Sequence, residues 1–185
     1  MKKDTREILL DSGYKEIYKN GYQGASIVTI LKEVSINKGS MYYFFKSKKE
    51  LGLAIIKERI QKNLIAKYEI ILENEKPVEV LFETLISAPE LLIYGCPLNK
   101  MTQEMLYIDE DFKELLSLVY RAFEDAVENI LIKGIEQNEI ASCPTKITAQ
   151  LIISTYEGAL MIYHLNQDKE QYTQILQMLK IKLFN

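Results

Sequence analysis

The stretch that decides the fold of this protein covers residues 26–51 and reads SIVTILKEVSINKGSMYYFFKSKKEL. Its helical units are shorter than a packed core alone requires. Ser26 and Asn37 can each cap a short helix, the first over residues 27–34 and the second over residues 38–44. A three-residue turn would join the two. This spacing predicts a helix-turn-helix.

The first turn of the second short helix suits a DNA groove, because small side chains there let the backbone approach base edges and phosphates. Gly39 and Ser40 provide that clearance. Lysines around the helix can displace counterions from DNA, and nearby hydroxyls can reach phosphate oxygens. Ser47 can cap the next helix and so form a further phosphate site with Lys48. The predicted DNA-binding residues are Ser26, Asn37, Lys38, Gly39, Ser40, Tyr42, Tyr43, Lys46 and Lys48.

The aromatic run at residues 42–45 has an alternative interpretation, in which the rings form only a small core. We expect this of Phe45. For Tyr42 and Tyr43 we favour DNA contact, because a phenol has an apolar body and a polar tip.

These residues resemble the TetR/AcrR family of transcriptional regulators. The similarity extends over about residues 9–51 and rests on Gly21-Tyr22, Ser26-Ile27, Ile30 and the run from Ile36 to Leu51. The sequence departs from the family pattern at Leu31, where a small Ala is usual, and at Ser35, where Gly is usual. The resemblance implies an N-terminal three-helix DNA-binding domain, a larger helical domain that binds a small ligand, and a homodimer.

Composition agrees with an ordinary globular chain. The 185 residues are 48% hydrophobic and 26% charged, which excludes collagen-like and disordered classes. Residues 1–50 carry a net charge of +4 and residues 51–185 a net charge of −7. A basic front end joined to an acidic remainder indicates that the front end meets a polyanion, although so small an excess can also arise by chance.

Helical periodicity continues through the rest of the chain, and no window shows strand alternation. Helices are expected over residues 4–20, 48–74, from Pro77 toward Pro89, from Pro97 to about 106, from Asp109 to about 138, from Pro144 onward, and at the C-terminus. The fold class is therefore all-α, with a DNA-binding domain over residues 1–50 and a ligand-binding and dimerisation domain over residues 51–185.

Dimerisation is also favoured by physics, since one recognition helix contacts too few base pairs for operator specificity and a two-fold dimer doubles the site. Two apolar stripes in the last third of the chain can form a four-helix contact with a partner. An internal core within one subunit remains the alternative. The predicted dimerisation residues are Leu151, Thr155, Gly158, Ala159, Ile162, Leu176, Leu179 and Leu183.

Residues 78–165 contain the side chains of an apolar effector pocket, because small-molecule sites are mostly apolar and methionines adapt to irregular ligands. Each of these residues could instead be plain core. An effector would act by favouring a dimer geometry that mismatches the operator. The predicted ligand-binding residues are Phe82, Cys96, Met101, Met105, Tyr120, Phe123, Tyr156 and Tyr163.

Cys96 also allows a reactive role. It precedes Pro97 at a helix start, where positive potential lowers a thiol pKa and favours reaction with oxidants or electrophiles. Resemblance adds to this, since some family members with Gly-Cys at this point sense reactive compounds. A small buried cysteine is the alternative, and for His164 a polar residue near a helix end is the simplest interpretation.

An enzyme on a helical bundle would need metal-ligand spacing or a nucleophile with its base, and neither is visible in the sequence. We expect no metal, no cofactor, no membrane span and a cytoplasmic location. The expected function is a ligand-responsive DNA-binding repressor, with double-stranded operator DNA and an unidentified small molecule as partners. The alternative is a dimeric helical protein that binds small molecules without sequence-specific DNA binding.

Overall fold

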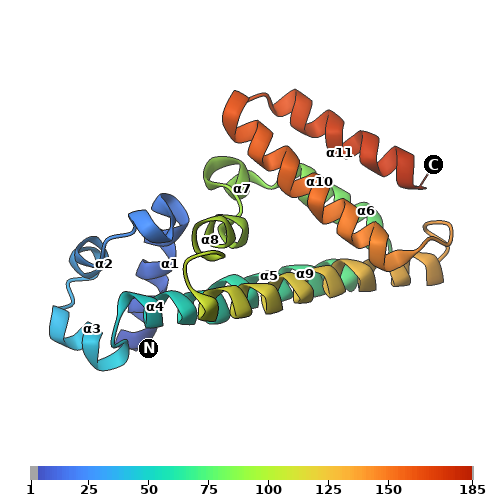
Figure 1. Cartoon of the computed structure of the whole chain (residues 1–185). Coiled ribbons are helices and arrows are strands. Elements are labelled where there is room, and N and C mark those ends of the chain that lie inside the picture. The colour runs from blue at the N-terminus through green and yellow to red at the C-terminus, as the bar shows by residue number, and fades with distance from the viewer. Residues whose placement is uncertain (1–3, 185) are drawn as a thin grey trace. The chain divides into compact units, whose positions relative to one another are not determined.

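The computed structural model describes residues 4–184 and contains only helices over that range (Figure 1). The all-α prediction is confirmed. The elements are α1 (Thr5–Gly24), α2 (Ile27–Glu33), α3 (Lys38–Phe44), α4 (Lys48–Ile55), the π-helical η1 (Ile56–Gln61), α5 (Lys62–Leu72), α6 (Pro77–Ser87), α7 (Pro89–Tyr94), α8 (Pro97–Met105), α9 (Glu110–Glu136), α10 (Thr145–Asn166) and α11 (Lys169–Phe184).

The first compact unit combines the N-terminal helices, up to residue 63, with residues 97–119. Within it α1 packs against α2, α3, α4, η1 and α8. The apolar face of α1 is buried, with Leu9 fully covered and Ile17 nearly so. A Cβ at Gly13 would lie 2.8 Å from Ile55, so this glycine lets α1 lie close to α4. The unit therefore holds the helix-turn-helix on one long supporting helix.

Gly21 breaks α1 as the sequence predicts. Its φ of 75° and ψ of 168° are outside the helical region, and one further turn then continues to Gly24. A side chain at Gly21 would also collide with the carboxylate of Glu104 on α8. Glycine is thus required here for both conformation and space.

The helix predicted over residues 48–74 has a wide turn that periodicity did not reveal. Residues 56–61 are π-helical, between α4 and α5. Arg6 forms a bidentate pair with Glu58, with N–O distances of 2.9 and 2.5 Å, and Arg59 binds Glu7 and Asp11 at 2.8 Å. The wide turn therefore coincides with the ionic contact between η1 and α1, and such turns are often found at functional positions.

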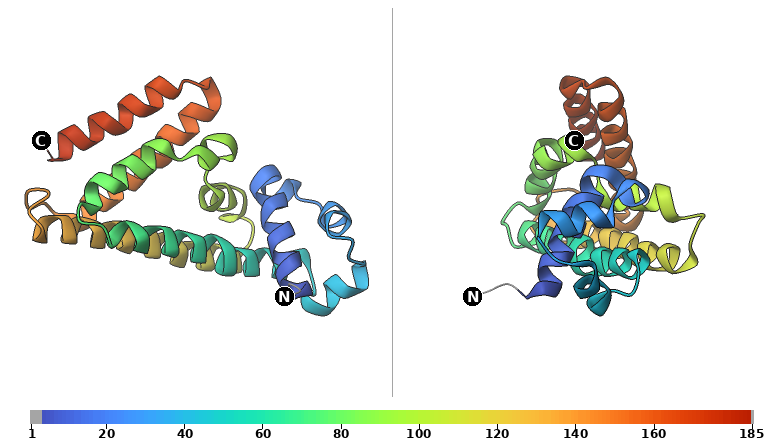
Figure 2. Two further views of the ribbon diagram at one scale, coloured as in Figure 1. Left: turned by 180° about the vertical axis from the view of Figure 1, so that it is seen from behind. Right: turned by 90° about the vertical axis from the view of Figure 1, so that its left-hand side faces the viewer.

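The second compact unit combines residues 64–96 with residues 120–185, of which the structure describes those up to 184. Its helices α10 and α11 form an antiparallel hairpin (Figure 2), α11 packs on α6, and α10 contacts α7. The Tyr172 hydroxyl donates to the carbonyl of Leu85, while Glu139 caps α6 by accepting from the amides of Val78 and Glu79. Residues distant in sequence thus provide hydrogen-bond partners for backbone groups near both ends of α6.

Two features of this region depart from the expected pattern. The six-residue helix α7 was not predicted, because six residues are too few to show helical periodicity. The compact units also follow boundaries other than residue 50, so the predicted division into residues 1–50 and 51–185 stays a prediction about function. No single helix of residues 4–184 has the length and apolarity of a membrane span, although the bent pair Pro77–Tyr94 with Pro97–Met105 passes that test by length and composition.

Candidate nucleic-acid interface and effector site

The helix-turn-helix forms through the predicted caps. Ser26 Oγ accepts a hydrogen bond from the amide of Thr29 at 3.4 Å, and Asn37 Oδ1 accepts one from the amide of Ser40 at 2.8 Å. Between the two helices Ser35 has a φ of 55°, in the left-handed region that favours glycine. The turn therefore forms with serine at the position where the family usually has glycine.

Helix α3 separates an inner side from an outer side. Met41 and the following Phe45 are buried at 0% and 2% exposure, which agrees with the expectation that Phe45 is core. Tyr43 is 75% exposed and Tyr42 is 39% exposed, and Lys38 and Gly39 are also exposed. The Lys38 ammonium lies 5.8 Å from the centre of the Tyr42 ring. The outer side thus presents a cation, two phenols and a stretch of backbone without a side chain.

The lysines around α3 differ in what they contact. Lys46 Nζ donates to the carbonyls of Tyr42 and Tyr43 at 3.3 and 3.4 Å, at the C-terminal end of α3. Lys49 is bound between Asp109 and Asp111 at 2.7 Å each, and these hydrogen bonds raise the pKa of its ammonium. Lys49 is consequently committed to a contact within the first unit.

Lys48 is held at the start of α4. Its Nζ donates to the carbonyl of Gln23 at 3.2 Å and lies 4.8 Å from the centre of the Tyr22 ring. Partial burial lowers the pKa of Lys48, and the carboxylates of Glu104 and Glu16 only partly oppose this shift. The Lys48 ammonium is thus oriented before any ligand arrives.

Ser47 caps α4 as predicted, by accepting from the amide of Glu50 at 3.1 Å. The Glu50 carboxylate in turn accepts from the amide of Lys46 at 2.6 Å. This reciprocal pair is a capping box. It fixes the chain where α3 ends and α4 begins.

Glu104 makes a contact that the sequence did not predict. Its carboxylate accepts from the amide of Gln23 at 2.6 Å, beside the Lys48 site. Eighty-one residues separate the two partners, and no local motif announces such a contact. Through Glu104, helix α8 is linked to the backbone that precedes the helix-turn-helix.

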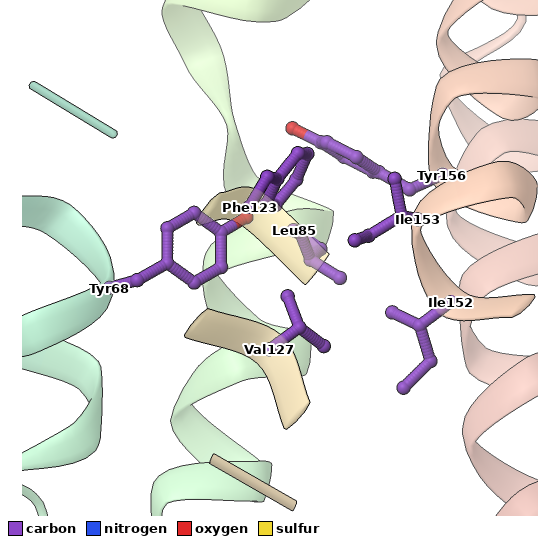
Figure 3. Close-up of a pocket in the computed structure, with 7 residues that line it drawn as sticks. All are labelled: Tyr68, Leu85, Phe123, Val127, Ile152, Ile153 and Tyr156. Atoms are coloured by element: carbon purple, nitrogen blue, oxygen red, sulfur yellow. The ribbon is translucent and has the colours of Figure 1, made fainter. Parts of the chain in front are cut away.

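The predicted ligand-binding residues fall into both units. Met101 and Met105 are buried in the first unit, and Gln23 Nε2 donates to the Met105 sulfur at 3.2 Å. In the second unit the side chains around one small apolar cavity converge from α5, α6, α9 and α10 (Figure 3). The lining residues are Tyr68, Leu85, Phe123, Val127, Ile152, Ile153 and Tyr156.

The cavity is a narrow space among these side chains and has no room for a water molecule. Phe123 and Tyr156 are the predicted ligand residues on its wall. Burial raises the pKa of the Tyr156 hydroxyl well above its usual value, and the hydroxyl of Tyr172 is its polar neighbour.

The other predicted ligand residues lie elsewhere in the second unit. The Phe82 ring packs edge-on against Phe184, with 5.9 Å between the centroids. Tyr163 is half-buried at 5.9 Å from Tyr172, and Tyr120 is half-buried on α9. Phe123 and Tyr156 are thus the predicted residues that line the cavity of Figure 3.

Cys96 is half-buried between Gly95 and Pro97, as the sequence places it before α8. Lys67 is nearby, and burial lowers the pKa of its ammonium while Cys96 and Glu90 partly oppose that shift. His164 Nε2 is 3.0 Å from the carbonyl of Leu91, which agrees with the simple structural interpretation of this residue.

The predicted dimerisation stripe is partly covered within one chain. Ala159 and Leu176 are buried at 3% and 0% exposure, as expected for a core inside the subunit. Leu151 and Ile162 are exposed, and Gly158 has open space where a Cβ would lie. Thr155, Leu179 and Leu183 are half-buried. The exposed apolar side chains of the hairpin are Ile147, Leu151, Met161, Ile162, Leu165, Met178 and Ile181.

Comparison with known proteins covers both parts of the chain. Residues 9–55 match the family described as bacterial regulatory proteins of the tetR family, and residues 79–179 match the tetracyclin repressor-like C-terminal domain. The chain is 33% identical over 178 residues to an uncharacterized HTH-type transcriptional regulator of Lactococcus lactis, with 90% of this chain and 86% of that protein covered. It is 22% identical over 163 residues to the fatty acid metabolism regulator protein of Bacillus subtilis, covering 87% and 84%.

Solved structures have the same fold. The reduced form of NemR from Escherichia coli superposes with a TM-score of 0.82 at 22% identity and 98% coverage of both chains. A regulator from Agrobacterium tumefaciens superposes with a TM-score of 0.84 at 16% identity and 97% coverage of both. These proteins are transcriptional regulators, and transcriptional regulators are not a class of enzyme.

Proposed function

The chain belongs to the TetR family of bacterial transcriptional regulators, and from this premise we propose that it is a repressor released from its operator by a small molecule. Regulators of this family bind DNA operators and small-molecule effectors and form dimers. The proposed partners of this chain are a double-stranded operator, one effector and a second copy of itself. Its proposed place of action is the cytoplasm, and no catalytic step is involved.

The observation that carries the proposal is the outer side of α3. Its first turn combines Lys38 with the bare backbone of Gly39, and Tyr42 and Tyr43 are exposed although they are aromatic. Buried Met41 and Phe45 hold the helix from behind. Exposed phenols next to a cation need an explanation on a solvated surface, and a DNA backbone and groove supply one.

The remaining proposed DNA contacts surround α3. The hydroxyls of Ser26 and Ser40 and the ammonium groups of Lys46 and Lys48 would bind phosphates, while Asn37 sets the start of the recognition helix. Lys48 would exchange its carbonyl partner for a phosphate oxygen. This exchange is favourable because a phosphate carries full charge.

For the homodimer we propose the exposed face of the α10–α11 hairpin, with Leu151, Thr155, Gly158 and Ile162 near its centre. Ile147, Leu151, Ile162 and Leu165 are exposed on α10, and together with the half-buried Thr155 and Gly158 they follow one another at spacings of three and four, which is the pattern of a helix that packs against another helix. A solvated face of this kind is costly, and a two-fold partner would cover it. Leu179 and Leu183 would flank the contact.

For the effector we propose a site in the second unit around Phe123 and Tyr156, with Phe82, Cys96, Tyr120 and Tyr163 as further wall residues and Met101 and Met105 as residues that respond to binding. The cavity must widen to admit a ligand, and its lining favours an apolar one. Native mass spectrometry of the purified protein would detect a retained molecule.

A gel-shift titration against the DNA upstream of its own gene tests the proposal. We expect wild type to bind one sequence tightly, and Tyr42→Ala to lose that binding with the dimer intact in analytical ultracentrifugation. The matched control is Tyr107→Ala, a 93% exposed phenol on the loop before α9, which we expect to bind like wild type. Equal binding of wild type to every duplex would contradict the repressor and support a dimeric ligand-binding protein.

A further inference from the structure

A second charged feature lies in the first unit, apart from α3. An open groove of about 560 Å³ runs between α1 and α2. Its walls are Lys15, Glu16, Lys19, Thr29, Lys32 and Glu33. Three ammonium groups thus face one hollow from two helices.

The carboxylates of the groove are already engaged. Glu16 accepts from the amide of Ser26 at 3.2 Å, and Glu33 accepts from Ser12 Oγ at 2.9 Å and lies 4.0 Å from Lys15 Nζ. No ion pair within residues 4–184 involves Lys19 or Lys32. The Thr29 side chain is exposed beside them. The groove wall therefore carries three ammonium groups and two carboxylates, a net charge of +1, and Lys19 and Lys32 are its two cations without an ion pair among the described residues.

The cations of the basic N-terminal quarter differ in whether they are available to bind a polyanion. Arg6 is bound to Glu58, and Lys49 is bound to Asp109 and Asp111, so neither cation is available to a polyanion. Among the described part of residues 1–50, the other cations form two groups. One group, Lys38, Lys46 and Lys48, adjoins α3. The other group, Lys15, Lys19 and Lys32, lines the groove.

Ser26, one of the proposed DNA-binding residues, adjoins the groove. The carboxylate of Glu16, on the groove wall, holds the amide of Ser26, whose hydroxyl caps α2. A backbone phosphate that passes Ser26 would next meet the groove. Cations in a hollow attract phosphate more strongly than isolated surface charges do, because the hollow focuses the field.

We infer that the α1–α2 groove binds a phosphate of the DNA backbone that flanks the base pairs contacted by α3, with Lys19 and Lys32 as the cations and Thr29 as the neutral donor. The inference rests on the proposed function and extends its footprint. Such a contact fixes the register of the protein on the duplex and carries no sequence information. It is therefore a positioning contact.

The test compares Lys19→Gln/Lys32→Gln with wild type in salt titrations of operator binding. Each neutralised phosphate contributes about 0.9 to the steepness of log affinity against log salt, so loss of the one phosphate in the groove should reduce the steepness of the double variant by about 0.9. The loss of affinity between about 50 and 200 mM salt should then be about 3.5-fold smaller in the variant than in wild type. The preference for operator over random DNA should stay unchanged. The matched control is Lys57→Gln/Lys62→Gln, two exposed lysines of the same unit outside the groove.

Phosphate ethylation interference locates the contact. We expect wild type to be blocked by ethylation at a phosphate outside the half-site, and the groove variant to be insensitive at that phosphate. A variant with the wild-type slope and the wild-type interference pattern would overturn the inference while operator binding stands. Equal binding of wild type to operator and to random DNA would instead overturn the proposed function, so the two failures are distinguishable.

Discussion

Ser35 has a backbone conformation that is unfavourable for a residue with a side chain. It occupies the left-handed region at φ 55°, where a Cβ is disfavoured by roughly 1–2 kcal/mol. Glycine removes that cost but adds flexibility to the unfolded chain. We predict that Ser35→Gly raises the free energy of unfolding by about 0.5–1 kcal/mol in urea titrations. Ser35→Val should lower it, and a gain in stability from valine would contradict the strained turn.

At the level of elements, the ionic contact between η1 and α1 links two helices of the first unit. The hydrogen bond from Arg6, together with its charge, lowers the pKa of Glu58 below its usual value in the folded state. A carboxyl with a lowered folded pKa stabilises the fold above its unfolded pKa near 4.5, and this contribution is lost as the pH falls through the folded value.

We therefore predict that Glu58→Gln lowers the free energy of unfolding at pH 7 by about 1 kcal/mol. At a pH below both pKa values the variant and wild type should be equally stable, because Glu58 is then neutral. Urea titrations across this range measure the difference. The exposed pair Lys113–Glu110 provides the control, and Glu110→Gln should change stability little at either pH. A pH-independent loss in Glu58→Gln would exclude the ionic origin.

At the scale of the whole molecule, a substitution at Gly158 can test dimerisation separately from the stability of the single chain. A Cβ there meets nothing within one chain, and alanine favours a helix over glycine by about 1 kcal/mol. If the exposed face of α10 meets a partner closely, the added methyl group would press on that partner. We predict that Gly158→Ala weakens the dimer in sedimentation equilibrium without destabilising the chain. By contrast, Gly52→Ala should unfold the first unit more readily, since its Cβ would lie 2.6 Å from Tyr22.

Local signals in the sequence determined the helical class, the caps at Ser26, Asn37 and Ser47, and the break at Gly21. These depend on residues three or four apart, whose energetics are already present in the chain. The outer and inner sides of α3 followed from the same spacing. For this reason the amino-acid sequence alone is enough to predict the helix-turn-helix.

Only the tertiary structure decided which charged and polar groups pair with one another. Lys49 with Asp109, Glu104 with Gln23, and the groove that Lys19 and Lys32 share all join residues distant along the chain or on separate helices. The π turn in η1 and the narrow cavity at Tyr156 likewise depend on which surfaces meet. Periodicity shows that a face is apolar or charged, but the partner of that face is chosen by three-dimensional packing, and packing energies do not reside in any single segment.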